Sequence, residues 1–301
     1  MGTRATLVVA TADRGAGLRQ LEQMLRVLEN TERALSTWRD ESLLSQMNRH
    51  PLGRPWHAPP RICELLAQTA GWRDETAGAF DPVVGVPVEA WMAAAQAPSN
   101  RLVQPSKAAG FEHLIFERDT CTVTRLENVT LDPGGFGKGE ALDRISRQLA
   151  GTAAAPWMVD LGGQVLVSGV SSTGTWPVAI AHPLDREQTV VELQLRDGSL
   201  AVSGGSERDR WVGGVRVGHI VDPRSGLPVA REDSVVVWHR EAFVADVLST
   251  ALYVMGQEAG LSWAEARDVA VCFVSPSDRW RAPDPVTFRA SSTFRRRFAL
   301  P

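Results

Sequence analysis

Lysine is almost absent from this sequence, which has two lysines against thirty arginines in 301 residues. Cysteine is also scarce, and the three residues Cys63, Cys121 and Cys272 lie far apart. Such an odd, sparse set does not indicate a disulfide framework, so the sequence predicts buried free thiols. No apolar run approaches the roughly 20 residues that span a bilayer, and no basic-then-apolar signal begins the chain. The sequence as given therefore predicts no membrane span.

Charge and length exclude further classes of protein. The net charge is −3, which argues against a general nucleic-acid footprint. Apolar residues make up 44% of the chain and charged residues 22%, as in an ordinary globular protein with an ample core. We expect residues 1–301 to form a single domain, helix-rich over about 1–110 and strand-rich over about 111–301.

Apolar spacing predicts the elements of this domain. Helical periodicity predicts helices over 18–35, 43–47, 62–72, 139–149 and 242–255, a helical turn at 91–97 and a loop at 78–88. Alternation and turn residues predict strands over 6–10, 114–116, 122–124, 129–131, 156–169 (two strands and a Gly-Gly turn), 176–181, 190–195, 200–203, 234–238 and 269–274. We therefore expect an α+β fold with mixed or antiparallel sheets flanked by helices, rather than a doubly wound sheet.

Lys138 stands among four glycines, in the segment that runs from Leu131 to Asp143. A lysine kept in a chain that otherwise uses arginine suggests a site with no room for a guanidinium. The predicted helix begins near Gly139, and the free N–H groups of its first turn suit a phosphate. Neither the P-loop pattern nor the dinucleotide-binding pattern is matched. A glycine-rich turn with a surface lysine is the structural alternative.

Asp246 and Thr250 are four residues apart in a predicted helix, so they share one face. Both carry hard oxygens, which Mg²⁺ prefers in small number because water and substrate phosphate complete its coordination. The structural alternative is an aspartate that is stabilised by the helix dipole, beside a threonine packed in the core.

Two further segments carry candidate residues. His219 lies at a predicted strand end just before Asp222-Pro223-Arg224-Ser225-Gly226, which is a strong turn signal. Either a structural or a catalytic histidine fits that position. The loop Gly78–Pro82 places Phe80 beside Asp81, and an aromatic ring with a carboxylate could line a ring-binding slot.

Taken in this order, the segments resemble the FAD:protein FMN transferases, the ApbE-like family. The resemblance extends over nearly the whole chain and no single motif decides it. Its motifs are M-G-T at 1–3, L-S-T-W at 35–38 with Ser42, Leu44 and Asn48, G-A-F-D-P at 78–82, the segment 131–143, V-D-L-G-G at 159–163, A-V-S-G at 201–204, and the segments 219–226 and 246–256.

The resemblance implies an ApbE-like fold, similar to T-fold-type arrangements, and a Mg²⁺-dependent transferase. Its members split the pyrophosphate of FAD and attach FMN to a Thr or Ser of an acceptor flavoprotein, and AMP leaves. The implied FAD contacts are Met1, Trp38, Ala79, Phe80, Asp81, Asp132, Lys138 and Ile220. The implied metal ligands are the backbone carbonyl of Gly135 and the side chains of Asp246, Ser249 and Thr250.

The chemistry agrees with these assignments. Splitting a pyrophosphate requires neutralisation of phosphate charge, which a metal ion and Lys138 supply. The acceptor hydroxyl is a poor nucleophile unless it is activated, and His219, which matches the family's histidine beside the reacting phosphate, is the candidate base. Lys138, His219 and Asp246 are therefore the expected catalytic residues. Trp38 replaces the family's usual tyrosine, ring for ring, whereas Gly205-Ser206 departs from the polar and aromatic residues found there.

Expected partners follow from the resemblance. They are FAD and an acceptor flavoprotein that carries a D-G-x-[ST]-G-A-[ST] motif, and this chain lacks that motif itself. Members of the family are commonly exported or anchored, so the compartment of this chain is left open, as is its oligomeric state, with a homodimer among the options. The alternatives to the transferase are an FAD pyrophosphatase, with water in place of the acceptor, and a non-catalytic flavin-binding protein.

Overall fold

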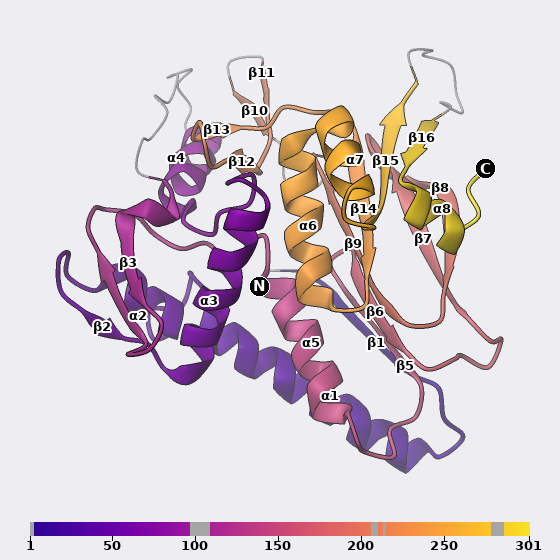
Figure 1. The fold of residues 1–301 in the computed structure, drawn as a ribbon. Helices are drawn as coiled ribbons and strands as arrows, with labels where there is room; N and C mark the ends of the chain where they lie inside the picture. Colours follow the sequence, from indigo (N-terminus) through magenta and orange to yellow (C-terminus); the bar gives the residue numbers. More distant parts are fainter. Residues whose placement is uncertain (1–2, 97–108, 206–209, 213–214, 278–285) are drawn as a thin grey trace. The chain divides into compact units, whose positions relative to one another are not determined.

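The structure is a computed structural model that describes residues 3–96, 109–205, 210–212, 215–277 and 286–301 (Figure 1). The chain divides into two compact units. Unit 1 comprises Met1–Glu32, Phe136–Ser206 and Glu232–Pro301, and unit 2 comprises Arg33–Gly135 and Glu207–Arg231. Both units are built from separate stretches of chain.

Unit 1 is built on a seven-stranded antiparallel sheet with the order β1-β5-β6-β9-β14-β15-β16. Its strands are β1 (Ala5–Val9), β5 (Trp157–Leu161), β6 (Gln164–Ser168), β9 (Gly198–Gly204), β14 (Ser234–His239), β15 (Ala270–Pro276) and β16 (Val286–Ala290). A separate two-stranded sheet pairs β7 (Trp176–His182) with β8 (Asp185–Leu195).

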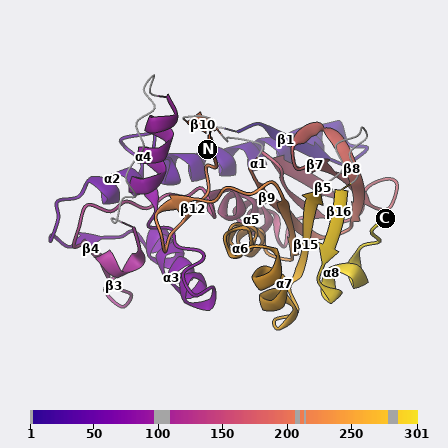
Figure 2. The same cartoon turned by 90° about the horizontal axis from the view of Figure 1, so that it is seen from above.

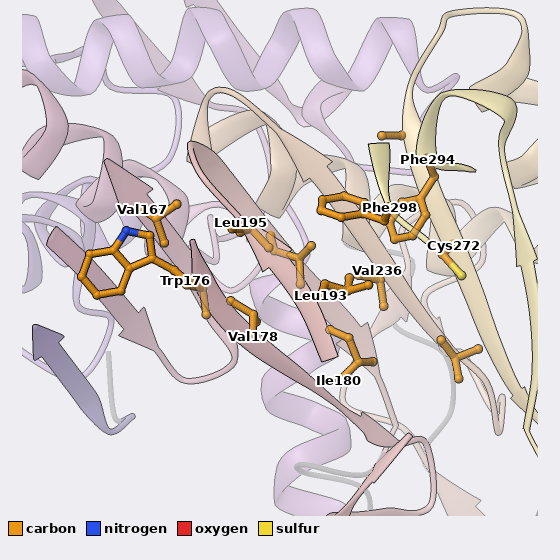
Figure 3. Close-up of a cluster of buried hydrophobic side chains, with 14 residues drawn as sticks. Val167, Trp176, Val178, Ile180, Leu193, Leu195, Val236, Cys272, Phe294 and Phe298 are labelled. Carbon is orange, nitrogen blue, oxygen red and sulfur yellow. The ribbon is translucent and has the colours of Figure 1, made fainter. Parts of the chain in front are cut away.

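Two apolar cores lie on the two faces of this sheet, because successive residues of a strand point to opposite faces. In β6, Leu166 belongs to one core, whereas Val165 and Val167 belong to the other. The first core joins β5 and β6 to α1 (Arg14–Leu35) and α5 (Gly137–Leu149). Figure 3 shows the second core, in which side chains of β7 and β8 gather with Phe294 and Phe298 at the C-terminal helix α8 (Ser292–Arg297).

The helix α6 (Ala242–Met255) packs against α5 and against strands β9 and β14, and it is followed by α7 (Gln257–Glu265). Figures 1 and 2 both show α5 beside α6. Almost every residue of α6 is buried, which explains its nearly continuous apolar sequence. Among the described residues, no helix is long and apolar enough to cross a membrane.

Unit 2 contains helices α2 (Leu43–Arg49), α3 (Pro60–Glu75) and α4 (Gly85–Gln96), and the 3₁₀ helix η1 (Phe111–His113). A three-stranded sheet has the order β2-β4-β3, from β2 (Trp56–His57), β3 (Leu114–Glu117) and β4 (Thr122–Arg125). Two short hairpins follow: β10 (Arg210–Val212) with β11 (Val215–Val217), and β12 (Val221–Asp222) with β13 (Leu227–Pro228).

Most predicted elements are present, and two predictions are wrong. The loop predicted over 78–88 ends earlier, because α4 begins at Gly85 and Pro87 lies in its first turn, where proline is tolerated. The strand predicted over 129–131 does not form. The side-chain amide of Asn48 replaces a neighbouring strand there: its Oδ1 accepts from Leu131 N at 2.9 Å and its Nδ2 donates to Leu131 O at 2.9 Å.

The prediction of free thiols is wrong for two of the three cysteines. Cys63 in α3 and Cys121 in the turn between β3 and β4 form a disulfide across 58 residues of sequence. Spacing along the chain did not reveal this pair, because only the packing of α3 beside that turn brings the Cα atoms to 5.4 Å. Cys272 is free and buried, as predicted.

Candidate active site

The part of the candidate site that carries Lys138 and Asp246 lies in unit 1, where the first turn of α5 meets α6. Lys138 Nζ lies 2.7 Å from Asp246 Oδ1, and the Asp246 side chain is only 3% exposed. Asp246 Oδ2 accepts a hydrogen bond from Gly139 N at 2.9 Å. Gly139 N–H belongs to the first turn of α5, whose N–H groups have no partner within the helix. Lys138 is therefore an ion-pair partner of Asp246, and its side chain is 25% exposed.

Gly139 is required by the close approach of the two helices. A Cβ atom added there would lie 2.4 Å from Ala242 O and 2.6 Å from Phe243 Cα, and both atoms belong to the backbone. Gly139 therefore has a packing role in the helix contact. Its position near a phosphate stays a prediction. Only glycine allows Gly139 N to reach the carboxylate of Asp246 across this contact.

Asp143 holds the other side of the same helix pair. Its carboxylate accepts hydrogen bonds from Ala242 N at 2.7 Å and from Phe243 N at 2.9 Å, at the start of α6. Burial raises the pKa of Asp143, although the two N–H donors act to lower it. Sequence reasoning included Asp143 in the family motif but assigned it no role. Its partners, Ala242 and Phe243, lie 99 and 100 residues further along the chain, so no local pattern identifies them.

The oxygens near Asp246 fit the magnesium ion that the family implies. Ser249 Oγ donates to Asp246 O at 2.9 Å and lies 2.8 Å from Ser203 Oγ, and Thr250 is partly buried next to it in α6. Among the described residues no group of three or more His, Cys, Asp or Glu side chains could hold a metal ion. One carboxylate with hydroxyls suits Mg²⁺, which keeps water and takes substrate phosphate oxygens as its remaining ligands.

Six of the predicted FAD contacts lie in unit 2, and Trp38 is the most exposed of these six. Trp38 follows the end of α1 in a turn, and the residue is 90% exposed. The turn is held by Ser42, the N-cap of α2, whose Oγ donates to Ser36 O at 2.5 Å and accepts from Ser45 N at 3.0 Å. The indole ring of Trp38 is thus exposed to solvent on a turn that hydrogen bonds hold in place, and another aromatic ring can stack on it.

Backbone hydrogen bonds hold the segment that carries Asp132. Asp132 N donates to Pro82 O at 2.8 Å, and the amide of Asn48 holds the preceding residue, Leu131. The carboxylate of Asp132 accepts from Gly134 N at 2.7 Å. These bonds join the segment of Asp132 to the loop of Asp81, so two predicted FAD-binding segments lie side by side. Burial raises the pKa of Glu89 in α4, and the negative charge of Asp132 raises it further. The sequence analysis did not single out Glu89.

The loop Thr76–Pro82 carries three predicted FAD contacts, Ala79, Phe80 and Asp81. Ala79 and Phe80 are 1% and 2% exposed, so the ring of Phe80 is a core residue. The carboxylate of Asp81 is also buried. Burial raises the pKa of Asp81, while hydrogen bonds from Val83 N and Phe111 N and the charge of Arg73 act to lower it.

The turn after His219 lies against the same loop. A Cβ atom added at Gly78 would lie 3.7 Å from Arg224 Cγ, and Arg224 is paired with Asp222 at 2.8 and 2.9 Å. The side chain of Trp91 donates to Gly226 O at 3.1 Å. The predicted turn is therefore confirmed, and His219 and Ile220 lie partly buried at its start.

The structure thus groups the predicted residues within each unit. Lys138, Asp246, Ser249 and Thr250 come together in unit 1, while Trp38, Ala79–Asp81, Asp132, Gly135, His219 and Ile220 belong to unit 2. The segment from Asp132 to Lys138 runs from one unit into the other. Met1 lies outside the described residues. Asn48, Arg73 and Asp143 received no role from sequence reasoning. The partners of Asn48 and Asp143 lie 83 to 100 residues away along the chain.

Comparison with known proteins identifies the family. A model of the ApbE family matches residues 1–273. The FAD:protein FMN transferase of Vibrio cholerae serotype O1 is 30% identical over 279 residues, which span 90% of this chain and 82% of that protein.

The chain belongs to the ApbE family.

Solved structures agree with this. The flavin transferase ApbE from Vibrio cholerae matches with a TM-score of 0.79 and 28% identity, covering 98% of this chain and 96% of that one. The ApbE protein from Thermotoga maritima matches with a TM-score of 0.84 and 26% identity, covering 99% and 97%. These matches confirm the expected ApbE-like α+β fold. They also place this ApbE-family chain among enzymes of the transferase class.

Proposed function

We propose that this ApbE-family enzyme transfers FMN from FAD to a threonine or serine hydroxyl of an acceptor protein and releases AMP, in a Mg²⁺-dependent reaction. The observation that supports this most is the ion pair between Lys138, at the start of α5, and the buried carboxylate of Asp246 in α6. Flavin binding alone requires neither a buried carboxylate nor a cation beside it. Transfer through a pyrophosphate requires both a metal-binding carboxylate and a cation for the phosphate oxygens.

In the reaction, the acceptor oxygen forms a bond to the phosphorus of the FMN moiety, and the bond from that phosphorus to the bridging oxygen breaks. AMP leaves with that oxygen, and the proton of the hydroxyl passes to the imidazole of His219. Lys138 stabilises the charge of the pyrophosphate oxygens. The exposed ring of Trp38 stacks on the flavin ring.

The remaining predicted residues take supporting roles in the proposal. FAD is bound by the segments that carry Met1, Ala79, Phe80, Asp81, Asp132 and Ile220. Asp246, Ser249, Thr250 and the carbonyl of Gly135 would hold Mg²⁺, which would supply neutralisation of charge on the phosphates. Since Ala79 and Phe80 have buried side chains, the loop that carries them binds FAD through its backbone.

Mass spectrometry tests the proposal directly. The protein is incubated with FAD, Mg²⁺ and an acceptor that carries a D-G-x-[ST]-G-A-[ST] motif, and with the same acceptor in which alanine replaces the modified Thr or Ser. We expect covalent FMN on the first acceptor, none on the second, and one AMP released for each FMN attached. Free FMN and AMP without an adduct would instead identify a pyrophosphatase, and bound FAD without turnover a flavin carrier.

A further inference from the structure

Arg73 connects three segments around the proposed flavin-binding loop. It lies in the last turn of α3, with its side chain one-third exposed. Its Nε donates to Asp81 Oδ2 at 3.2 Å, and its Nη2 donates to Glu112 Oε2 at 2.9 Å. A third bond reaches Asp74 Oδ1 at 3.2 Å. One guanidinium therefore joins α3, the loop that follows it and the 3₁₀ helix η1.

The carboxylate of Asp81 points into this junction, and its side chain is 3% exposed. Oδ1 accepts from Val83 N at 2.8 Å, and Oδ2 accepts from Phe111 N at 2.9 Å as well as from Arg73. Both oxygens are thus used by the protein itself. A carboxylate this buried is costly unless a cation and hydrogen bonds compensate for the lost water, and Arg73 is that cation.

Glu112, the second partner of Arg73, packs its carboxylate against Gly110. Gly110 has a φ of +116°, and a Cβ atom there would lie 2.4 Å from Glu112 Oε1. The carboxylate of Glu112 therefore lies directly over Gly110, whose positive φ is one that glycine adopts readily. Gly110 N also donates to Val83 O at 2.9 Å, so the loop and the segment before β3 are joined twice.

We infer that Arg73 is a positioning residue for FAD binding, which acts by holding the buried carboxylate of Asp81 and with it the backbone of the loop Thr76–Pro82. This inference rests on the proposed function, because that loop carries the proposed FAD contacts. Without Arg73 the loop occupies its binding conformation for a smaller fraction of the time, and the apparent FAD affinity falls in proportion to that fraction. Turnover at saturating FAD changes little, because Lys138, Asp246 and His219 act on the phosphates.

The test measures FAD affinity and turnover separately. We expect Arg73→Met to raise the dissociation constant for FAD about 10-fold, followed by flavin fluorescence, while kcat at saturating FAD stays within about 2-fold. Arg73→Lys keeps the charge and should recover part of the affinity. Glu112→Gln removes only the negative charge of the outer partner and should weaken binding about 3-fold. Arg54→Met, which removes an exposed arginine from the same unit, is the control and should bind as the wild type does.

Several outcomes would overturn the inference. Wild-type FAD affinity in a folded Arg73→Met variant would do so, as would a loss confined to kcat. If thermal unfolding shows that Arg73→Met does not fold, wild-type affinity in both Arg73→Lys and Glu112→Gln would overturn it. Failure of the proposed function looks different, because the wild type would then bind FAD without forming an FMN adduct, while the variants would still report on affinity. A wild type that binds no FAD would overturn both.

Discussion

Asp143 and Asp246 each accept hydrogen bonds from the first turn of the other's helix. Asp246 in α6 accepts from Gly139 N of α5, and Asp143 in α5 accepts from Ala242 N and Phe243 N of α6. Two helices that begin at the same place thus satisfy each other's free N–H groups. The exchange holds the carboxylate of Asp246 beside Lys138, so it links the packing of unit 1 to the proposed chemistry.

Asp246 should matter for turnover through its charge. We expect Asp246→Ala to lower turnover at least about 100-fold, the typical effect of losing one electrostatic stabiliser. Asp246→Asn keeps an acceptor for Gly139 N but loses the charge, so it should lose as much turnover with a smaller loss of stability. FMN transfer and thermal unfolding, measured together on both variants, check this. Wild-type turnover in either variant would refute the assignment of Asp246 to the metal.

Lys138→Arg should not behave as a conservative change. The ammonium is a compact charge 2.7 Å from Asp246 Oδ1, next to the close backbone contact at Gly139, and a guanidinium is wider and planar. We expect a loss of turnover of about 10-fold or more from the altered position of the charge. Titration of FMN transfer against FAD measures it, and Arg19→Lys on the exposed face of α1 is the control for an Arg–Lys exchange elsewhere in unit 1.

The glycines at positions 139 and 71 should respond in opposite ways to alanine. Gly139→Ala places a methyl group 2.4 Å from Ala242 O, so we expect it to lower the free energy of unfolding by about 1–3 kcal/mol or more. Gly71 lies in α3 with nothing within 4 Å of an added Cβ, so Gly71→Ala should raise that free energy by roughly 0.5–1 kcal/mol. Urea unfolding compares the two variants. Equal effects would contradict the close helix contact.

The disulfide should stabilise the folded chain. Its two cysteines are 58 residues apart, and closing a loop of that length removes unfolded-state entropy worth about 4 kcal/mol. We expect the double variant Cys63→Ser, Cys121→Ser to lose about that much free energy of unfolding in urea, and reduction of the wild type to have a similar effect. A reducing agent should not destabilise the double variant further. A loss of less than about 1 kcal/mol would show that the bond adds little.

Cys272 should make stability depend on pH in the alkaline range. Burial raises the pKa of its thiol from 9.0 to about 12. The unfolded chain therefore loses this proton near pH 9, whereas the folded protein keeps it, so the contribution to stability is present below pH 9 and is lost as pH rises toward 12. Between pH 9 and 11 the wild type should lose about 2 kcal/mol more free energy of unfolding than Cys272→Ala. Parallel curves for the two proteins would exclude this pKa.

Local patterns in the sequence predicted much of the fold. The apolar stripe of α1, the buried run of α6 and the Gly-Gly turn between β5 and β6 all formed as expected, because periodicity reports directly on which side of an element is buried. The strand predicted over 129–131 failed because a side chain distant in sequence, Asn48, took the backbone bonds of Leu131. The loop before α4 ends earlier than predicted, because Pro87 lies in the first turn of α4, where proline is tolerated.

The sequence by itself determined the family, the α+β class and the residues that carry the proposed chemistry, because residue type and motif order are properties of the chain. Only the tertiary structure decided how those residues are held. It paired Lys138 with Asp246, joined Cys63 to Cys121 and placed Arg73 on the carboxylate of Asp81. The first two pairs span 108 and 58 residues of chain, and the Arg73 junction also includes Glu112, 39 residues away. Contacts at such separations depend on how whole helices and strands pack, which no local pattern records.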